Sequence, residues 1–137
     1  PKDLTVGIGC RKGRSGAEIS EFLQTVFQKF DLDKRRIARF ASISLKEKEA
    51  GILELAFAER APFLTFTAQE LEAVPGKFEA SGFVRKTVGV DNVCERAAVL
   101  GSGGGRLLVP RQAAGGITIA AAQRMPVIRF YRNDKGN

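Results

Sequence analysis

The first third of the chain switches from a strand-like to a helical pattern of apolar residues. Leu4 to Gly9 is a short apolar run that ends in glycine, which predicts a buried strand. Ser15, followed three residues later by Glu18, is a capping box, the side-chain signature of a helix start. The apolar residues after this box recur at helical spacing: Ile19, Phe22, Leu23, Val26, Phe27 and Phe30. We therefore expect the first helix over about residues 16–30.

A second strand and a second helix are expected after the turn at residues 31–33. Residues 36–43 predict the strand. Ser44 with Glu47 repeats the capping spacing, so we expect the second helix to begin there. Its expected inward face consists of Leu45, Ile52, Leu53 and Ala56.

The same alternation continues with a third strand over residues 63–66. Thr67 with Glu70 caps a short third helix, which we expect to end before Pro75. A strand followed by a helix, repeated in this way, is typical of a sheet with helices packed on it. The pattern therefore predicts an α/β fold.

The second half of the chain begins with a segment of weak periodicity, residues 76–89, which we expect to be a long functional loop. A fourth helix follows, with these residues on or near one face: Val90, Val93, Cys94, Ala97, Ala98 and Gly101. Residues 107–109 and 117–122 predict two strands, which we expect to form a hairpin on the sheet edge. Residues 127–131 fit either a further strand or a partly ordered tail.

The composition is that of one globular domain. A chain of 137 residues with 44% hydrophobic residues buries a core without disulfides or metals. We expect a single domain over 1–137, with a core over about 4–122 and a basic tail over 124–137. No apolar run approaches the roughly 18 residues of a membrane span, and the N-terminus lacks a signal-peptide pattern. With only two cysteines, the expected compartment is the reducing cytoplasm.

The net charge of +7 points to an anionic partner. Nucleic acid is one candidate, but the basic residues are scattered and no aromatic-rich basic face accompanies them, which disfavours it. The chain has no histidine. This excludes histidine-based triads, histidine general bases and histidine-ligated metals, and we expect neither a metal nor a cofactor.

A glycine-rich turn between the first strand and the first helix is a candidate anion-binding site. Its spacing, G-x-G-x-x-x-G over residues 7–13, is one residue longer than the dinucleotide fingerprint. Backbone amides at a helix start favour an anion, and Arg11 and Lys12 add charge-assisted bonds. A purely structural tight turn explains the glycines equally well. Cys10 lies beside these cations, where the pKa of a thiol is expected to fall; we expect packing rather than a nucleophilic role for it.

Three further groups of polar residues are candidate site residues. Lys46 and Glu49 form either an ordinary surface pair or part of a ligand site at a strand end. Glu95 on the fourth helix has the same two interpretations. Ser81 in the long loop offers a hydroxyl to a carboxylate. Cys94, on the apolar stripe of the fourth helix, is expected in the core.

Five segments occur in order along the chain: residues 6–13 (VGIGCRKG), 41–52 (ASISLKEKEAGI), 89–98 (GVDNVCERAA), 105–109 (GRLLV) and 118–120 (TIA). With this combination the chain resembles the CobE / CbiG C-terminal domain family of cobalamin biosynthesis over about residues 4–122. The resemblance implies a three-layer α/β/α fold with a mixed, mostly parallel sheet and an edge hairpin. Arg111 departs from the family pattern, which more often has lysine there.

The resemblance also implies a function in corrin ring synthesis. CbiG combines such a domain with an N-terminal part, and the whole protein opens a lactone on a cobalt-precorrin and releases acetaldehyde. A chain with only the C-terminal type of domain resembles CobE of the aerobic pathway. We therefore expect an accessory or carrier protein that binds a precorrin or hydrogenobyrinic-type tetrapyrrole, with other cobalamin-biosynthesis enzymes as further candidate partners.

The expected ligand-binding residues combine the glycine turn with nearby polar side chains. They are Gly9, Cys10, Arg11, Lys12, Gly13, Lys46, Ser81 and Lys86. The alternative function is a lactone hydrolase, in which Glu49 or Glu95 acts on water as the general base. A basic nucleic-acid-binding module is the third, least favoured hypothesis.

Overall fold

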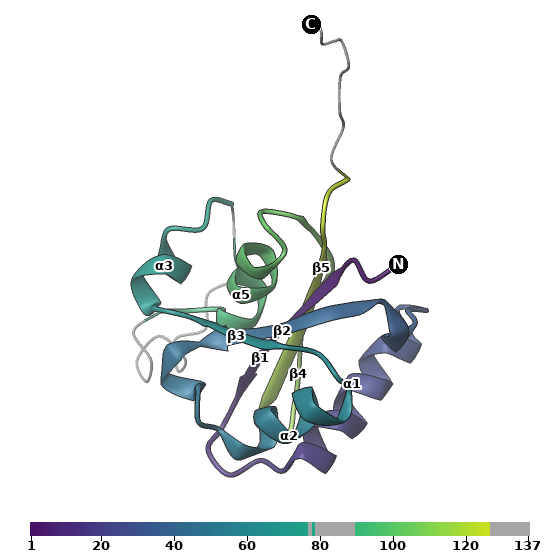
Figure 1. The fold of residues 1–137 in the computed structure, drawn as a ribbon. Helices are drawn as coiled ribbons and strands as arrows, with labels where there is room; N and C mark the ends of the chain where they lie inside the picture. The colour runs from purple at the N-terminus through teal and green to yellow at the C-terminus, as the bar shows by residue number, and fades with distance from the viewer. Residues whose placement is uncertain (77, 79–89, 127–137) are drawn as a thin grey trace, which may run out of the picture.

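The computed structural model describes residues 1–76, 78 and 90–126, which alternate between strands and helices (Figure 1). In chain order the elements are β1 (Leu4–Cys10), α1 (Gly16–Lys29), η1 (Lys34–Arg36), β2 (Ile37–Ile43), η2 (Ser44–Lys46), α2 (Ala50–Ala58), β3 (Phe63–Phe66), α3 (Ala68–Glu72), α5 (Val93–Gly101), β4 (Arg106–Ala114) and β5 (Ile117–Gln123). Both predicted capping boxes that involve Ser15 and Thr67 are present.

The described strands form one mixed sheet in the order β3-β2-β1-β5-β4. β1, β2 and β3 run parallel, whereas β5 runs antiparallel to both β1 and β4. The β4–β5 hairpin closes one side of the sheet, as the sequence predicts. Because β5 is antiparallel to β1, Ile117 at its start pairs with Cys10, where β1 ends. The carboxyl ends of β1 and β2 and the hairpin turn therefore meet at the same edge.

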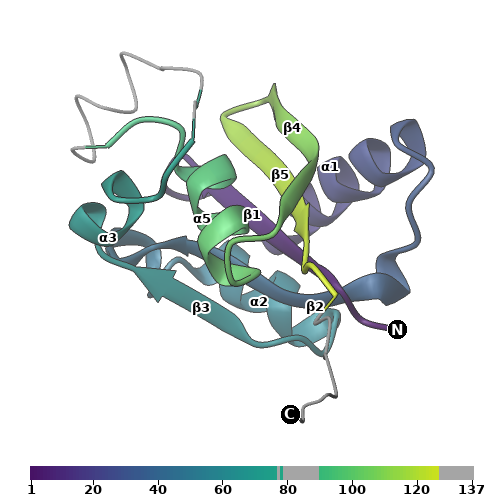
Figure 2. The same cartoon turned by 90° about the horizontal axis from the view of Figure 1, so that it is seen from above.

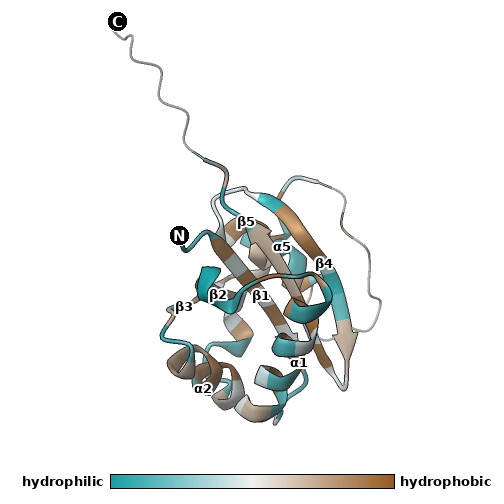
Figure 3. Ribbon diagram, turned by 90° about the vertical axis from the view of Figure 1, so that its right-hand side faces the viewer, coloured by the Kyte–Doolittle hydropathy of each residue, from teal (hydrophilic) through white to brown (hydrophobic). Residues whose placement is uncertain are grey.

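Helices cover both faces of the sheet, which makes the three-layer α/β/α arrangement (Figures 1 and 2). Leu4, Val6 and Ile8 of β1 pack into the larger core with α1 and α2, and brown hydrophobic bands alternate with pale ones along this central strand in Figure 3. The opposite face packs against α5, whose Ala97 and Ala98 are fully buried. The α/β class and its layers are confirmed.

The close packing of α5 on β1 depends on one glycine. A Cβ atom at Gly7 would overlap the backbone carbonyl oxygen of Cys94 and lie 2.8 Å from the backbone nitrogen of Ala98. Since both groups belong to the backbone, neither can rotate away. Gly7 thus sets the height at which α5 lies above the sheet, and with it the position of the helix start.

The predicted start of the second helix is wrong. Ser44 begins the short 3-10 helix η2, which has no side-chain cap, and α2 begins only at Ala50 after its N-cap, Glu49. The extended backbone at Glu49 interrupts the helix that the Ser44–Glu47 spacing suggests. The interruption matters for function, because it leaves η2 and Glu49 at the carboxyl edge of the sheet.

The predicted inward face of that helix is half right. Ile52 and Ala56 are buried, together with Leu55, but Leu45 is 66% exposed and Leu53 is 44% exposed. Leu45 lies outside α2, so helical spacing does not apply to it. Leu53 follows the buried Ile52 by one residue, a rotation of about 100° that turns it toward solvent.

Candidate functional site

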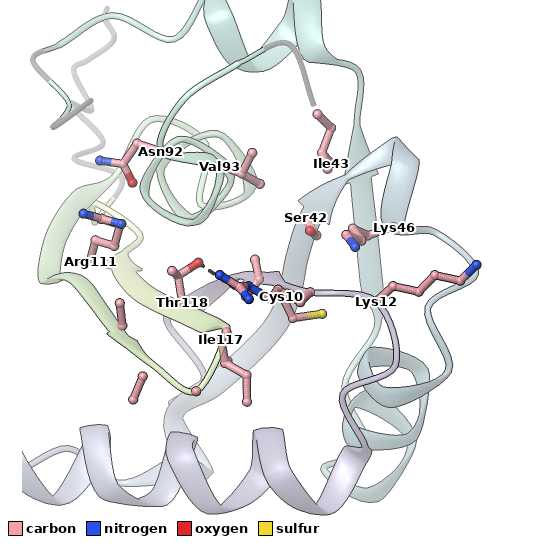
Figure 4. Close-up of a pocket in the computed structure, with 16 residues that line it drawn as sticks. Cys10, Lys12, Ser42, Ile43, Lys46, Asn92, Val93, Arg111, Ile117 and Thr118 are labelled. Atoms are coloured by element: carbon pink, nitrogen blue, oxygen red, sulfur yellow. Dashed lines mark hydrogen bonds between the residues drawn. The ribbon is translucent and has the colours of Figure 1, made fainter. Parts of the chain in front are cut away.

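A cavity of about 550 Å³ lies at the edge of the sheet where β1 and β2 end (Figure 4). Its walls come from the glycine turn, η2, the start of α5 and the β4–β5 hairpin. The lining residues are Gly9, Cys10, Arg11, Lys12, Ser42, Ile43, Lys46, Asn92, Val93, Arg111, Ala113, Ala114, Gly115, Gly116, Ile117 and Thr118. Open α/β sheets bind ligands in crevices at the carboxyl ends of their strands, so this cavity is the candidate site.

The lining of this cavity is strongly cationic. It includes Arg11, Lys12, Lys46 and Arg111, and the lining residues named above include no carboxylate. A second hollow, of about 610 Å³, lies at the opposite end of the sheet and has three cations and three carboxylates. The formal charges of this hollow therefore balance, and Lys34 pairs with Glu59 at 3.3 Å and Arg35 with Asp33 at 2.7 Å. The described lining of the first cavity has four cations and no carboxylate. The first cavity is therefore the one suited to an anionic ligand.

Two backbone amides of the glycine turn donate hydrogen bonds within the protein. The Arg11 amide donates to the Gly116 carbonyl at 2.8 Å, and the Gly13 amide donates to the Glu49 carboxylate at 3.1 Å. At the start of α1, the Gly16 amide donates to the Glu54 carboxylate at 3.0 Å. The protein's own carboxylates thus occupy two positions that the sequence offered to an external anion. The turn contributes the side chains of Arg11 and Lys12 to the cavity.

Lys46 and Glu49 form a largely buried ion pair, with their charged atoms 3.7 Å apart. The other carboxylate oxygen of Glu49 accepts the Gly13 amide. Glu49 therefore connects η2 to the glycine turn, while Lys46 lines the cavity. Among the two sequence-based interpretations of this pair, an exposed surface contact does not fit its burial.

Glu95 is 6% exposed and accepts hydrogen bonds on both carboxylate oxygens. Oε1 accepts from Asn92 Nδ2 at 2.7 Å, and Oε2 accepts from the backbone amide of Arg111, also at 2.7 Å. Asn92 and Arg111 both line the cavity, whereas Glu95 lies behind them. Its carboxylate holds two walls of the site together.

The two cysteines differ in position and agree in the direction of their pKa shift. Cys10 lines the cavity and is partly exposed; burial raises the pKa of its thiol, opposed by the nearby Lys46 ammonium. The sequence-based expectation of a lowered pKa is wrong, because the cost of desolvating the thiolate outweighs the cations. Cys94 lies in the core as predicted, and burial raises its pKa to about 12.

Comparison with known proteins assigns the family. Residues 4–122 match the protein family described as "Cobalamin synthesis G C-terminus". The chain belongs to this family.

Two relatives and one solved structure show how much this cobalamin-synthesis domain shares with others. The cobalt-precorrin-5A hydrolase of Salmonella typhimurium is 39% identical over 87% of this chain, and that of Priestia megaterium is 32% identical over 89%. These matches cover 34% and 32% of those proteins, so the chain spans about a third of their length. The crystal structure of CobE, a protein from the cobalamin (vitamin B12) biosynthetic pathway, is 27% identical. It superimposes with a TM-score of 0.83 over 91% of this chain and 92% of that one.

In this cobalamin-synthesis domain, the predicted ligand-binding residues partly converge. Gly9, Cys10, Arg11, Lys12 and Lys46 line one cavity; Gly13 lies in the adjoining turn. Ser81 and Lys86 lie outside the described residues. Whether any of these residues binds a ligand remains a prediction. Glu49 and Glu95 are close to the cavity without lining it.

Among the lining residues of the cobalamin-synthesis domain that sequence reasoning missed, four have polar or charged side chains: Ser42, Asn92, Arg111 and Thr118. One signal was available for Arg111. Pro110 precedes it within a strand, and proline inside a strand marks an edge or a bulge, where a side chain is often redirected.

Among the described helices, none combines the length and hydropathy that a membrane crossing requires.

Proposed function

We propose that this domain binds a polycarboxylate tetrapyrrole intermediate of cobalamin synthesis in the cavity at the carboxyl edge of its sheet, as an accessory or carrier protein. The observation that carries the proposal is the cavity lining, in which four cations accompany apolar side chains and no carboxylate is among the lining residues given above. Family membership supports the class of ligand, and so does the similarity in fold to CobE, a protein from the cobalamin biosynthetic pathway.

The chemistry of the lining suits such a ligand in two ways. Ile43, Val93 and Ile117 offer apolar surface for the edge of a macrocycle. Lys46 and Arg111 offer charge-assisted hydrogen bonds to acetate and propionate side chains. A ligand with several carboxylates around an apolar ring uses both features together, whereas a single inorganic phosphate uses only the charges.

The test is a titration of the protein with hydrogenobyrinic acid, a metal-free corrinoid, followed by the visible spectrum and by co-elution in gel filtration. We expect a spectral change at micromolar concentrations and about a tenfold loss of affinity in Lys46→Gln, which removes one charged hydrogen bond. Lys48→Gln is the matched control, since Lys48 is exposed and outside the cavity lining. The proposal is rejected if the wild-type protein shows no spectral change and does not co-elute with hydrogenobyrinic acid.

A hydrolase function is the second candidate, because the relatives from Salmonella typhimurium and Priestia megaterium are both named cobalt-precorrin-5A hydrolase. In that case Glu49 or Glu95 acts as the general base on water, and a lactone-bearing precorrin incubated with the protein yields acetaldehyde. The contacts of both carboxylates favour binding over catalysis, because each already accepts a backbone amide. A Glu49→Gln variant that releases acetaldehyde at the wild-type rate removes that residue from the mechanism.

A further inference from the structure

Strand β4 contains an irregularity at Pro110 and Arg111. Val109 pairs with Ala121 and Gln112 pairs with Ile119, so two residues of β4 stand opposite one residue of β5. This is the pattern of a β-bulge, and Pro110 has no amide to donate to the ladder. A bulge bends its strand and redirects a side chain. Here the residue at the bulge is Arg111, which lines the cavity.

The bulge is fixed to α5 by Glu95. The Arg111 amide donates to Glu95 Oε2 at 2.7 Å, and Asn92 at the start of α5 donates to Glu95 Oε1 at the same distance. Asn92 has a left-handed backbone, with φ of 51°, and it is 2% exposed. Glu95 therefore determines how both the bulge and the helix start meet the cavity.

Arg111 and Lys46 lie on opposite sides of the cavity (Figure 4). Lys46 follows β2 and Arg111 belongs to β4, with β1 and β5 between these strands. Three inter-strand spacings amount to about 14 Å. Cys10 and Ile117, from the two intervening strands, line the cavity between them. The two cations therefore enter the cavity from opposite walls, with the ends of β1 and β5 between them.

We propose that Lys46 and Arg111 are separate anchors for two carboxylates of one ligand, and that Glu95 is a positioning residue for Arg111. The inference concerns the same site as the proposed function and rests on it for the ligand's identity. It adds a requirement on the ligand: two carboxylates must be separated by an apolar stretch that crosses the ends of β1 and β5. A macrocycle with carboxylates on its rim meets this requirement, and so does a linear dicarboxylate of sufficient length.

The linear compounds provide a test that does not need the tetrapyrrole. Sebacate, its monomethyl ester and succinate are titrated against the full chain, with the backbone amide resonances of Gly115 and Gly116 as reporters beside the cavity. We expect sebacate to bind about tenfold more tightly than either of the other two, because both its carboxylates are held at once. Lys46→Gln and Arg111→Gln each remove this advantage, whereas Lys48→Gln and the exposed β4 variant Arg106→Gln keep it.

Glu95→Gln tests the positioning role. We expect it to shift the Arg111 amide resonance and reduce the advantage of sebacate while leaving the affinity for the monomethyl ester unchanged, which general unfolding would not do. Equal affinity of the wild-type protein for sebacate and its monomethyl ester overturns the two-anchor inference, even if hydrogenobyrinic acid binds. If hydrogenobyrinic acid does not bind but sebacate still binds more tightly than its monomethyl ester, the proposed function is rejected and the two-anchor inference stands.

Discussion

The carboxylate of Glu49, at the start of α2, accepts the backbone amide of Gly13 at 3.1 Å. The same carboxylate lies 3.7 Å from the ammonium group of Lys46. One side chain therefore holds the glycine turn, which precedes α1, against η2, which follows β2. The sequence suggested that the amides of the glycine turn bind an anion, but the Gly13 amide is bonded within the protein. The turn contributes Arg11 and Lys12 to the lining of the cavity.

Substitution of Glu49 separates its two contacts. Glu49→Gln keeps an oxygen that can accept the Gly13 amide but loses the charge opposite Lys46, whereas Glu49→Ala loses both. We expect Glu49→Ala to lower the free energy of unfolding by about 1–2 kcal/mol and Glu49→Gln to lower it less. Urea unfolding measures both values. Wild-type stability in the alanine variant would show that the contact contributes nothing.

The packing of α5 on β1 predicts a strong effect at Gly7. We expect Gly7→Ala to lower the free energy of unfolding by about 3 kcal/mol, because its Cβ meets the backbone of Cys94 and Ala98. Gly13→Ala is the control: no heavy atom lies within 4 Å of its Cβ position, and only its positive φ of 89° is unfavourable. It should cost about 1 kcal/mol. Equal losses in the two variants contradict the steric explanation.

The two thiols should react at very different rates with a thiol reagent such as 5,5′-dithiobis(2-nitrobenzoate). Burial raises the pKa of Cys10, so we expect its labelling at about pH 7.5 to be slower than that of glutathione and to accelerate as the pH rises. Cys94, with its pKa raised to about 12, should react only after unfolding. Cys10→Ser should abolish labelling of the folded protein.

The same reaction reports on the cavity. Since Cys10 lines it, a bound tetrapyrrole or sebacate should protect the thiol from the reagent. Labelling of Cys10 at an unchanged rate under saturating ligand would place the ligand elsewhere on the protein.

Asp3, just before β1, is a largely buried carboxylate in an ion pair with Arg36. The Arg36 guanidinium, with bonds of 3.0 and 2.9 Å, lowers the pKa of Asp3 from its ordinary value of 3.8 to about 2. Because the folded-state pKa is the lower one, the contribution of Asp3 is present above about pH 4 and is lost as the pH falls from about 4 to about 2.

We therefore expect Asp3→Asn to lower the free energy of unfolding by up to about 2 kcal/mol at about pH 7, and by much less at about pH 2. Urea unfolding across this range measures the difference. The exposed Asp31→Asn serves as the control and should leave the curve nearly unchanged. A difference between wild type and Asp3→Asn that is the same at both ends of the range would contradict the ion-pair explanation.

Local signals in the sequence predicted most of the fold. The capping boxes at Ser15 and Thr67 placed two helix starts correctly, since both depend on residues three apart in the chain. The spacing at Ser44 misled for a tertiary reason: Glu49 is held by Lys46 and Gly13, so the helix begins after it instead. A capping motif spans only four residues, so it contains no information about a contact with a turn 36 residues away.

The site residues were predictable only where a local sequence pattern marks them. Cys10, Arg11 and Lys12 stand out because they adjoin a glycine turn, and Lys46 because it follows a strand end. For Arg111, Pro110 is a local signal of an irregular strand, but the contact of the Arg111 amide with Glu95 and the antiparallel return of β5 involve residues distant in the chain. Pairing across the sheet brings these segments together, and a single sequence does not specify such pairing.

A crystal structure of the protein with hydrogenobyrinic acid tests the central claim most directly. We predict electron density for the macrocycle in the cavity beside Cys10, with one carboxylate at Lys46 and another at Arg111. Density in the hollow at the opposite end of the sheet, near Lys34 and Glu59, or no density at saturating ligand, would contradict it.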